Sequence, residues 1–336
     1  MGTELGETQA SGSADAFARE LRECSRRYLG WGTDEPGGVR GRRARPTNGE
    51  IMGRRGTRDP EGDGDGEPTG VPGMELLADA DRSDSWFLVV AGTPQSHVDL
   101  SDPAYLDFSY MRRIAHAADL VAPEGEPIDA LHLGAGALTL ARYVAHTRPG
   151  SRQRAVDVDA PLVEMVRRRL PWDRRAQLRV GIGDAREWIT ARHADSADLV
   201  ISDVFAGART PARLTSVEFY AEAARVLRPG GLLAVNIGDG HSLEHTRTQA
   251  ATVRAALPHV ALTAEPGILR GRRFGNLVLV AGHRPLPAQE LGRRAHRDPE
   301  MARLLEGEDL DRFVSGRAPV HDADAVDSPA PPDDVF

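Results

Sequence analysis

From Asp129 onward, short apolar runs alternate with longer runs whose apolar residues recur at helical spacing. The successive pairs are DALHLGAG with ALTLARYVAHT, RAVDVD with APLVEMVRRRL, QLRVGIGD with AREWITARH, and ADLVISDVF with LTSVEFYAEAARVL. Strand-helix units in such a succession require a mostly parallel sheet with helices on both faces, joined by right-handed crossovers. The order is completed by the strand-like run GGLLAVNIG, a helix over 244–257, and the strand-like runs HVALTA and FGNLVLVAG. The sequence therefore predicts an α/β fold with a doubly wound, mostly parallel, seven-stranded Rossmann-like sheet.

The segments outside this pattern set the expected domain boundaries. Residues 31–73 are crowded with Gly, Pro, Arg and Asp, and they contain too few aliphatic side chains to offset the entropy lost on ordering. Residues 86–92 are expected to form a strand that 93–98 continue toward a turn, with a helix within 105–120. We expect a disordered extension (1–73), a small N-terminal β/α layer (74–122), the Rossmann-like domain (123–285), a helical appendage (286–327) and a disordered tail (328–336).

Composition argues against several classes of function. The formal net charge of -8 disfavours nucleic acid or an anionic membrane as the main partner, since both would repel the chain. An arginine-rich stretch at 40–58 is followed by compensating acids at 59–67, which favours a solvated linker over an RNA-binding face. The single cysteine, Cys24, excludes an internal disulfide framework and a Cys-rich metal site. Without an apolar run of about 20 residues or a signal peptide, a cytoplasmic location and no metal are expected.

Candidate binding residues follow the strands, because ligands of such sheets bind at the carboxyl ends of strands. Gly134 and Gly136 follow the first strand and, lacking a Cβ, let the backbone approach a ligand closely. About 20 residues later Asp157 ends the second strand, where a carboxylate can accept hydrogen bonds from ribose hydroxyls. After the third strand, Asp184 precedes Ala185 and could accept from an adenine amino group. A glycine turn without a ligand is the structural alternative at Gly134 and Gly136, whereas Asp184 can cap the following helix and bind adenine at once.

Two further acidic residues lie at or just after strand ends. Asp159 is best explained as the N-cap of the helix that begins near Pro161. Asp203 closes the fourth strand and would face the reaction centre, where it could orient or deprotonate a nucleophile next to a sulfonium; a loop cap is the alternative. The chain has no GxxxxGK[ST] motif, and Ala137 and Leu138 offer nothing to a pyrophosphate. S-adenosylmethionine therefore fits better than NAD.

These motifs resemble those of the spermidine synthase family across Trp86 to Gly282. They are Gly92-Thr93-Pro94-Gln95, Phe108-Ser109-Tyr110, Gly134-Ala135-Gly136, Asp157-Val158-Asp159, Asp184-Ala185, Asp203-Val204-Phe205-Ala206 and the run from Leu214 to Tyr220. The resemblance implies a methyltransferase-type sheet that binds S-adenosylmethionine or its decarboxylated form. It implies that Gln95, Asp157, Asp184 and Ala185 hold the nucleoside, and that Tyr110 and Asp203 face a small-molecule acceptor. The sequence leaves open whether the protein forms a homodimer.

The chain also departs from the family pattern. Ala137 takes the place of an aspartate that grips the amine of decarboxylated S-adenosylmethionine, and Ala206 takes the place of one that binds the far amine of putrescine. Met111-Arg112 replaces a His-Glu pair. Each lost carboxylate removes about 1.5 to 3 kcal/mol of charge-assisted hydrogen bonding.

Two functions follow from this pattern of matches and departures. We expect a transferase that moves an aminopropyl or methyl group to a small nucleophile, similar to the spermidine synthase-like proteins of GC-rich actinobacteria, with putrescine a poor substrate. A non-catalytic nucleoside-binding or regulatory protein is the alternative. Retention of Gln95, Asp157, Asp184 and Asp203 together favours the enzyme.

Overall fold

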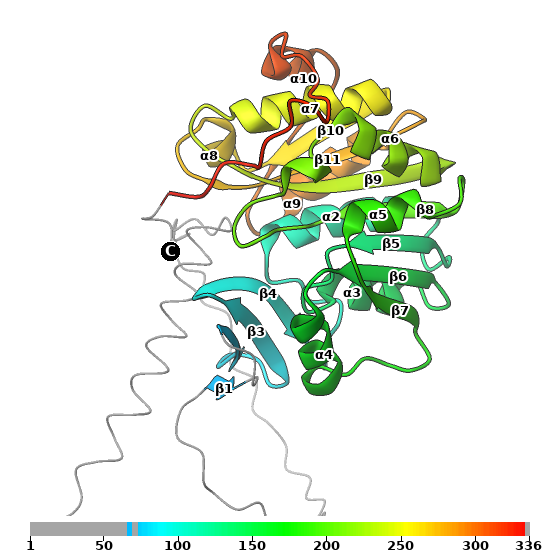
Figure 1. Cartoon of the computed structure of the whole chain (residues 1–336), viewed down its shortest axis with the longest axis vertical. Helices are drawn as coiled ribbons and strands as arrows, with labels where there is room; N and C mark the ends of the chain where they lie inside the picture. Colours follow the sequence, from blue (N-terminus) through cyan, green and yellow to red (C-terminus); the bar gives the residue numbers. More distant parts are fainter. Residues whose placement is uncertain (1–65, 69–72, 333–336) are drawn as a thin grey trace, which may run out of the picture.

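The computed structural model describes residues 66–68 and 73–332, which form two sheets (Figure 1). The small sheet is antiparallel, with strand order β1-β2-β3-β4. The large sheet has eight strands in the order β12-β10-β11-β9-β8-β5-β6-β7. Chain order reverses at β5, since β6 and β7 lie on one side of it and β8 and β9 on the other. A doubly wound sheet binds its ligands at such a reversal.

The seven predicted strands of the large sheet are all present. They are β5 (Asp129–Leu133), β6 (Arg152–Asp157), β7 (Gln177–Ile182), β8 (Ala197–Ser202), β9 (Leu227–Asp239), β10 (His259–Ala264) and β11 (Gly275–Gly282). The strands from β5 to β9 pair in parallel, whereas β11 is antiparallel to both of its neighbours. An eighth strand, β12 (Arg303–Leu305), adds to the edge at β10.

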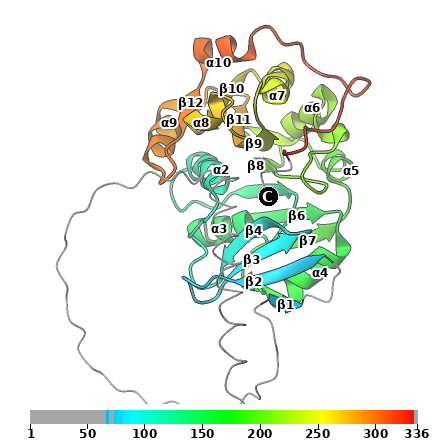
Figure 2. The ribbon, with the colours of Figure 1, turned by 90° about the vertical axis from the view of Figure 1, so that its left-hand side faces the viewer.

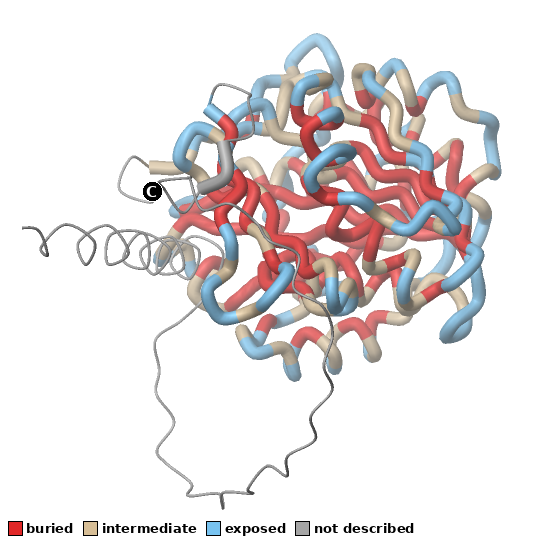
Figure 3. The backbone as a smooth tube through the Cα atoms, turned by 90° about the horizontal axis from the view of Figure 1, so that it is seen from below, coloured by how far each residue is buried: buried red, intermediate tan, exposed pale blue. Residues whose placement is uncertain are grey.

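Helices cover both faces of the large sheet, and this explains the continuous apolar runs of its strands. One face carries α2 (Ser109–Leu120), α3 (Thr139–Thr147), α4 (Ala160–Arg169) and α9 (Ala288–Arg297). The other carries α5 (Ala185–Thr190), α6 (Val217–Val226), α7 (Glu244–Ala256) and α10 (Gly307–Val314). Successive residues alternate between the faces, as Leu131 does with Ala130 and Val200 with Leu199. Figure 3 shows the buried strands running through the centre of the molecule.

The small sheet differs from the prediction for residues 86–98. They do not continue as one strand but form a hairpin of β3 (Ser85–Val90) and β4 (Thr93–Asp99). Ala91 and Gly92 form the two-residue turn, both with positive φ (49° and 78°), which is the backbone that such tight hairpins require. The hairpin packs below the large sheet beside α4, together with β2 (Met74–Ala78) (Figure 2). The reversal carries Gln95 and Ser96 on β4 back toward the large sheet.

Several predicted boundaries need correction. Residues 66–68 belong to the predicted disordered extension but form β1, which pairs with β2; residues 1–65 and 69–72 lie outside the described residues. Helix α2 falls within the predicted N-terminal layer, yet it packs on β9 and β11 of the large sheet. The predicted helical appendage also contributes β12. Ser328, the first residue of the predicted disordered tail, is buried and bonded through its backbone and side chain to Thr210. Residues 66–68 are placed by pairing with the neighbouring strand β2, whereas α2, β12 and Ser328 are placed by contacts with segments far away in the sequence.

Candidate active site

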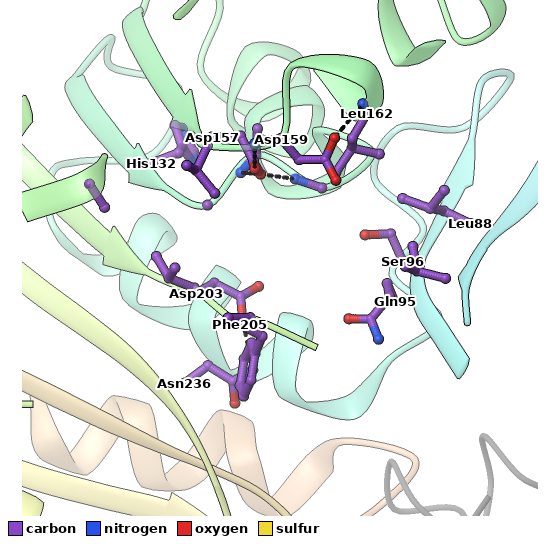
Figure 4. A pocket seen from close by; sticks show the side chains of 18 of the residues that line it. Leu88, Gln95, Ser96, His132, Asp157, Asp159, Leu162, Asp203, Phe205 and Asn236 are labelled. Atoms are coloured by element: carbon purple, nitrogen blue, oxygen red, sulfur yellow. Dashed lines mark hydrogen bonds between the residues drawn. The ribbon is translucent and has the colours of Figure 1, made fainter. Parts of the chain in front are cut away.

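A cavity of about 550 Å³ lies where the carboxyl ends of β5, β6, β7 and β8 face strand β4 (Figure 4). Its wall contains every site residue predicted from the sequence: Gln95, Tyr110, Gly134, Gly136, Asp157, Asp184, Ala185 and Asp203. Parallel strands end at one edge of a sheet, which is why motifs far apart in the sequence meet here. The structure thus brings the predicted residues together, and their individual roles remain predictions.

The glycine turn is fixed by contacts within the protein. Gly134 has a φ of +86°, and a Cβ built on it would lie 2.1 Å from the carbonyl oxygen of Asp203. Gly136 has a φ of +47°, and a Cβ there would lie 2.8 Å from Ser96 Oγ. Gly134 therefore excludes a side chain even before a ligand is considered, whereas at Gly136 the Ser96 hydroxyl can rotate and the positive φ is what disfavours a side chain.

Asp157 joins the end of β6 to the glycine turn. Its Oδ2 accepts hydrogen bonds from the backbone N–H groups of Ala135 at 2.9 Å and Gly136 at 3.4 Å (Figure 4). Its Oδ1 accepts from the N–H of Asp159 at 3.0 Å. A carboxylate has about four acceptor positions, so Asp157 keeps limited capacity for a ligand hydroxyl. The residue has a structural role that sequence reasoning did not foresee.

The predicted N-cap at Asp159 is confirmed, because its side chain accepts from the N–H of Leu162 at 2.9 Å and caps α4. Asp184 caps α5 through Oδ1, which accepts from Arg186 N at 2.9 Å and Glu187 N at 3.0 Å. Its second oxygen, Oδ2, lies 3.0 Å from Nη1 of Arg213. Asp184 is thus a helix cap and part of the cavity wall at once.

Asp203 forms a polar cluster on the opposite wall. Its Oδ1 accepts a hydrogen bond from Asn236 Nδ2 at 2.8 Å, and Tyr110 also hydrogen-bonds its carboxyl group. Desolvation raises the pKa of Asp203 from 3.8 to about 6, although the bonds from Asn236 and Tyr110 oppose the shift. In Figure 4, Asp203, Phe205 and Asn236 lie across the cavity from Gln95 and Ser96.

Asn236 and Arg213 also line the cavity, and the sequence does not predict either as a site residue. Asn236 is 4% exposed, and its Oδ1 has no hydrogen-bond partner among the described residues. A buried amide oxygen without a donor costs free energy, so a ligand N–H would find a ready acceptor there. The only sequence signal for Asn236 is a polar residue within the apolar run LLAVNIG. No sequence signal marks Arg213 as a site residue, because it is linked to the site only by its contact with Asp184 in the folded protein.

The charges on the cavity wall are unevenly distributed. Among the residues that the structure describes, the carboxylates that line it are Asp157, Asp159, Asp184 and Asp203, and of these only Asp203 lies on the side of β8 and β9. Ala206 lies in the same wall and is exposed. Ala137, by contrast, is fully buried in the apolar cluster beneath the small sheet and is not part of the wall.

Comparisons with known proteins agree with this geometry. The model of the spermine/spermidine synthase domain matches residues 107–268. The crystal structure of a probable spermidine synthase from Corynebacterium glutamicum is 34% identical, with a TM-score of 0.70, over 74% of this chain and 92% of that one. The chain belongs to the spermine/spermidine synthase family. The family resemblance and the α/β fold predicted from the sequence are confirmed.

Curated members of the spermine/spermidine synthase family match shorter regions. A probable polyamine aminopropyl transferase of Bifidobacterium longum is 31% identical over 114 residues, which is 33% of this chain and 25% of the relative. A polyamine aminopropyltransferase of Chromobacterium violaceum is 28% identical over 157 residues, 44% of this chain and 56% of the relative. The matches therefore span about a quarter and a little over half of these relatives.

Two further features are absent from the part of the chain that the structure describes. No helix there is long and apolar enough to cross a membrane. No group of three or more His, Cys, Asp or Glu side chains within 66–68 and 73–332 is arranged to hold a metal ion.

Proposed function

We propose that this chain transfers an alkyl group, aminopropyl or methyl, from S-adenosylmethionine or its decarboxylated form to an amine that carries a single ammonium group. One observation carries the proposal. Asp203, hydrogen-bonded by Asn236 and Tyr110, holds a desolvated carboxyl group across one cavity from the residues suited to a nucleoside. Such a placement brings a nucleophile and an electrophilic carbon together.

The nucleoside fits the side of the cavity formed by β5, β6 and β7. Asp157 would accept from the ribose, and Asp184 from the 6-amino group of adenine through Oδ2, since its Oδ1 caps α5. Val158 lines the cavity and is 71% exposed, so it offers an apolar surface to the base. Gln95 would contact the nucleoside from the facing strand β4.

The acceptor fits the side of Asp203. When bound, the sulfonium cofactor supplies an electrophilic carbon next to its positively charged sulfur. Asp203 would accept a hydrogen bond from the acceptor amine, and the unpaired Oδ1 of Asn236 offers a second acceptor. The acceptor nitrogen would have to attack as a neutral amine, so Asp203 would take one proton from its ammonium form; the carbon–nitrogen bond would then form as the carbon–sulfur bond breaks, and the thioether would leave with the nucleoside. A pKa near 6 makes Asp203 a stronger base than an ordinary carboxylate while leaving it ionised at neutral pH.

The charge distribution supports a single-amine acceptor. A second ammonium group near Ala206 would find no carboxylate partner on that side of the cavity among the described residues. Because Ala206 is exposed, that ammonium group would stay hydrated but would gain no charge-assisted hydrogen bond, which is worth about 1.5 to 3 kcal/mol. The curated relatives are named polyamine aminopropyltransferases, so diamines are the acceptors against which a preference for a monoamine must be tested.

A non-catalytic nucleoside-binding protein accounts less well for Asp203. A nucleoside site needs Asp157 and Asp184 but has no use for a desolvated carboxyl group on the opposite wall. Such a group lowers stability and is retained where function requires it.

The test is a transfer assay with each cofactor form and with acceptors matched in length, 1-aminobutane and putrescine, followed by mass spectrometry. We expect product with the monoamine and its loss in Asp203→Asn, with nucleoside affinity unchanged in calorimetry. Nucleoside binding without transfer to any amine would favour the binding protein. Full activity in Asp203→Asn would overturn the mechanism.

A further inference from the structure

A segment near the C-terminus is bonded along the loop that precedes α6. We call Val320 to Ser328 the C-terminal strap. Backbone N–H groups of the loop and of the first residue of α6 donate to it at three points: Thr210 N to Ser328 Oγ at 2.8 Å, Ala212 N to Asp327 Oδ1 at 2.8 Å, and Val217 N to Val320 O at 2.8 Å. Figure 2 shows the segment, in red, descending from α10 past α6 and α5.

The loop that the strap holds is a wall of the cavity. Pro211, Arg213 and Leu214 line the cavity, and all lie between the bonded residues Thr210 and Val217. Leu214 is buried in the core, which anchors one point of the loop. Arg213 is not anchored in this way, since its side chain is 48% exposed. Its position therefore depends on contacts from outside the loop.

Asp322 is the centre of those contacts. Its carboxylate accepts from Arg186 Nη1 at 2.5 Å and Nη2 at 2.6 Å, and from Ser216 Oγ at 2.5 Å. Arg186 Nη1 also donates to the backbone carbonyl of Arg213 at 2.9 Å. The side chain of Arg213 in turn pairs with Asp184 at 3.0 Å. A continuous series of contacts thus leads from the strap to the carboxylate that faces the cavity.

We infer that Asp322 is a positioning residue for the adenine end of the site, acting through Arg186 and Arg213 on Asp184. The inference rests on the proposed function, because it assigns Asp184 to the 6-amino group. The two-pronged bond between a carboxylate and a guanidinium fixes orientation as well as distance. Without Asp322, Arg186 keeps only the more distant charges of Glu218 and Asp184 and loses the orientation that supports the Arg213 carbonyl. Arg213 then no longer holds Oδ2 of Asp184 in one direction.

The test compares two nucleosides, methylthioadenosine and its analogue with hydrogen in place of the 6-amino group, by calorimetry. Asp322→Asn should weaken methylthioadenosine binding about 5- to 20-fold and leave the analogue within about 2-fold. Asp322→Glu should recover part of the loss. The control is Asp311→Asn, which removes a surface carboxylate paired with Arg254 at 2.6 Å, and it should change neither affinity. An equal loss for both nucleosides, or no loss, would overturn the positioning role.

A second measurement separates this inference from the proposed function. If the unmodified protein binds neither nucleoside, the proposed function fails. Amide hydrogen exchange then tests the strap alone, since the N–H groups of Thr210, Ala212 and Val217 donate to it. If the strap holds the loop in place, these amides should exchange at least 10-fold faster in Asp322→Asn than in Asp311→Asn. Unchanged exchange overturns it.

Discussion

Gly134 lies directly against the backbone of Asp203. A Cβ on Gly134 would lie 2.1 Å from the Asp203 carbonyl oxygen, and the Asp203 N–H donates to the carbonyl of Leu133 at 2.9 Å. The glycine turn and Asp203 therefore belong to one unit of the backbone. Under the proposed function, the sheet itself would set the distance between the nucleoside and the acceptor.

Gly134→Ala should be strongly destabilising. The new methyl group meets backbone atoms that cannot move without disrupting β5 and β8, and φ of +86° is costly for a side-chain-bearing residue. We expect a loss of at least about 3 kcal/mol in the free energy of unfolding. Gly207→Ala is the matched control, because Gly207 also has a positive φ (62°), but a Cβ added there would have no atom within 4 Å. It should lose only about 1 to 2 kcal/mol. Urea denaturation decides, and equal losses would contradict the contact argument.

Asp203→Asn should stabilise the protein at high pH. Because folding raises the pKa of Asp203 from 3.8 to about 6, the folded state binds its proton more tightly and loses stability as pH rises through 6. The amide does not titrate and can keep the bond from Asn236. We expect a gain of about 1 to 3 kcal/mol at pH 8 that shrinks toward pH 4. A gain that does not depend on pH would show that ionisation of Asp203 is not its cause.

The same carboxyl group predicts the pH dependence of transfer. If Asp203 takes the proton, kcat/KM should rise about tenfold per pH unit below 6 and level off above it. The residual rate of Asp203→Asn should lack this inflection. A wild-type profile that is flat between pH 5 and 7 would exclude Asp203 as the base.

Ala206→Asp should make putrescine a better substrate. The residue lies exposed in the cavity wall, so a carboxylate there can meet the far ammonium group of a diamine without being buried in the core. One such charge-assisted bond, about 1.5 to 3 kcal/mol, corresponds to roughly a 10- to 100-fold rise in kcat/KM. Ala206→Asn controls for size. Ala137→Asp is unsuitable, because it would place a charge in an apolar cluster. Robust spermidine formation by the unmodified protein would refute the single-amine preference.

The two functions of Asp157 can be separated by two substitutions. Asp157→Ala removes the acceptor of the Ala135 N–H and should lower both stability and nucleoside affinity. Asp157→Asn can keep that bond through its one oxygen, yet it replaces the other acceptor by a donor. Because that donor would face the N–H of Asp159, we expect a smaller fall in melting temperature than in Asp157→Ala and a loss of affinity for methylthioadenosine of at least 10-fold in calorimetry. Unchanged affinity in Asp157→Asn would remove Asp157 from the nucleoside site.

Much of the fold and the site could be predicted because its signals are local. The caps at Asp159 and Asp184 are read from residues two or three positions away. The strands follow from apolar runs, and once they are parallel, the residues that end them must share one edge. This accounts for the meeting of Gly134, Asp157 and Asp203.

The remaining features depend on contacts that the local sequence does not encode. Ala91-Gly92 is not a typical turn signal for a tight hairpin, so the sequence predicts β3 and β4 as one extended segment. Asn236 lies in an otherwise apolar strand, and its importance comes from Asp203, 33 residues earlier. Arg213 and Asp322 matter only through ion pairs between distant segments. A sequence pattern with a period of two or 3.6 contains no information about such pairs.

The C-terminal strap also affects the order in which the protein becomes competent during synthesis. Thr210 leaves the ribosome 118 residues before Ser328, and Ser216 leaves it 106 residues before Asp322. At a synthesis rate of about 5 to 20 residues per second, the strap is made on the order of 5 to 20 seconds after the loop that it contacts. The strands of the large sheet are all complete by then. A nascent chain would therefore acquire its core before the wall of its cavity, and under the proposed function nucleoside binding would mark a late stage of its maturation.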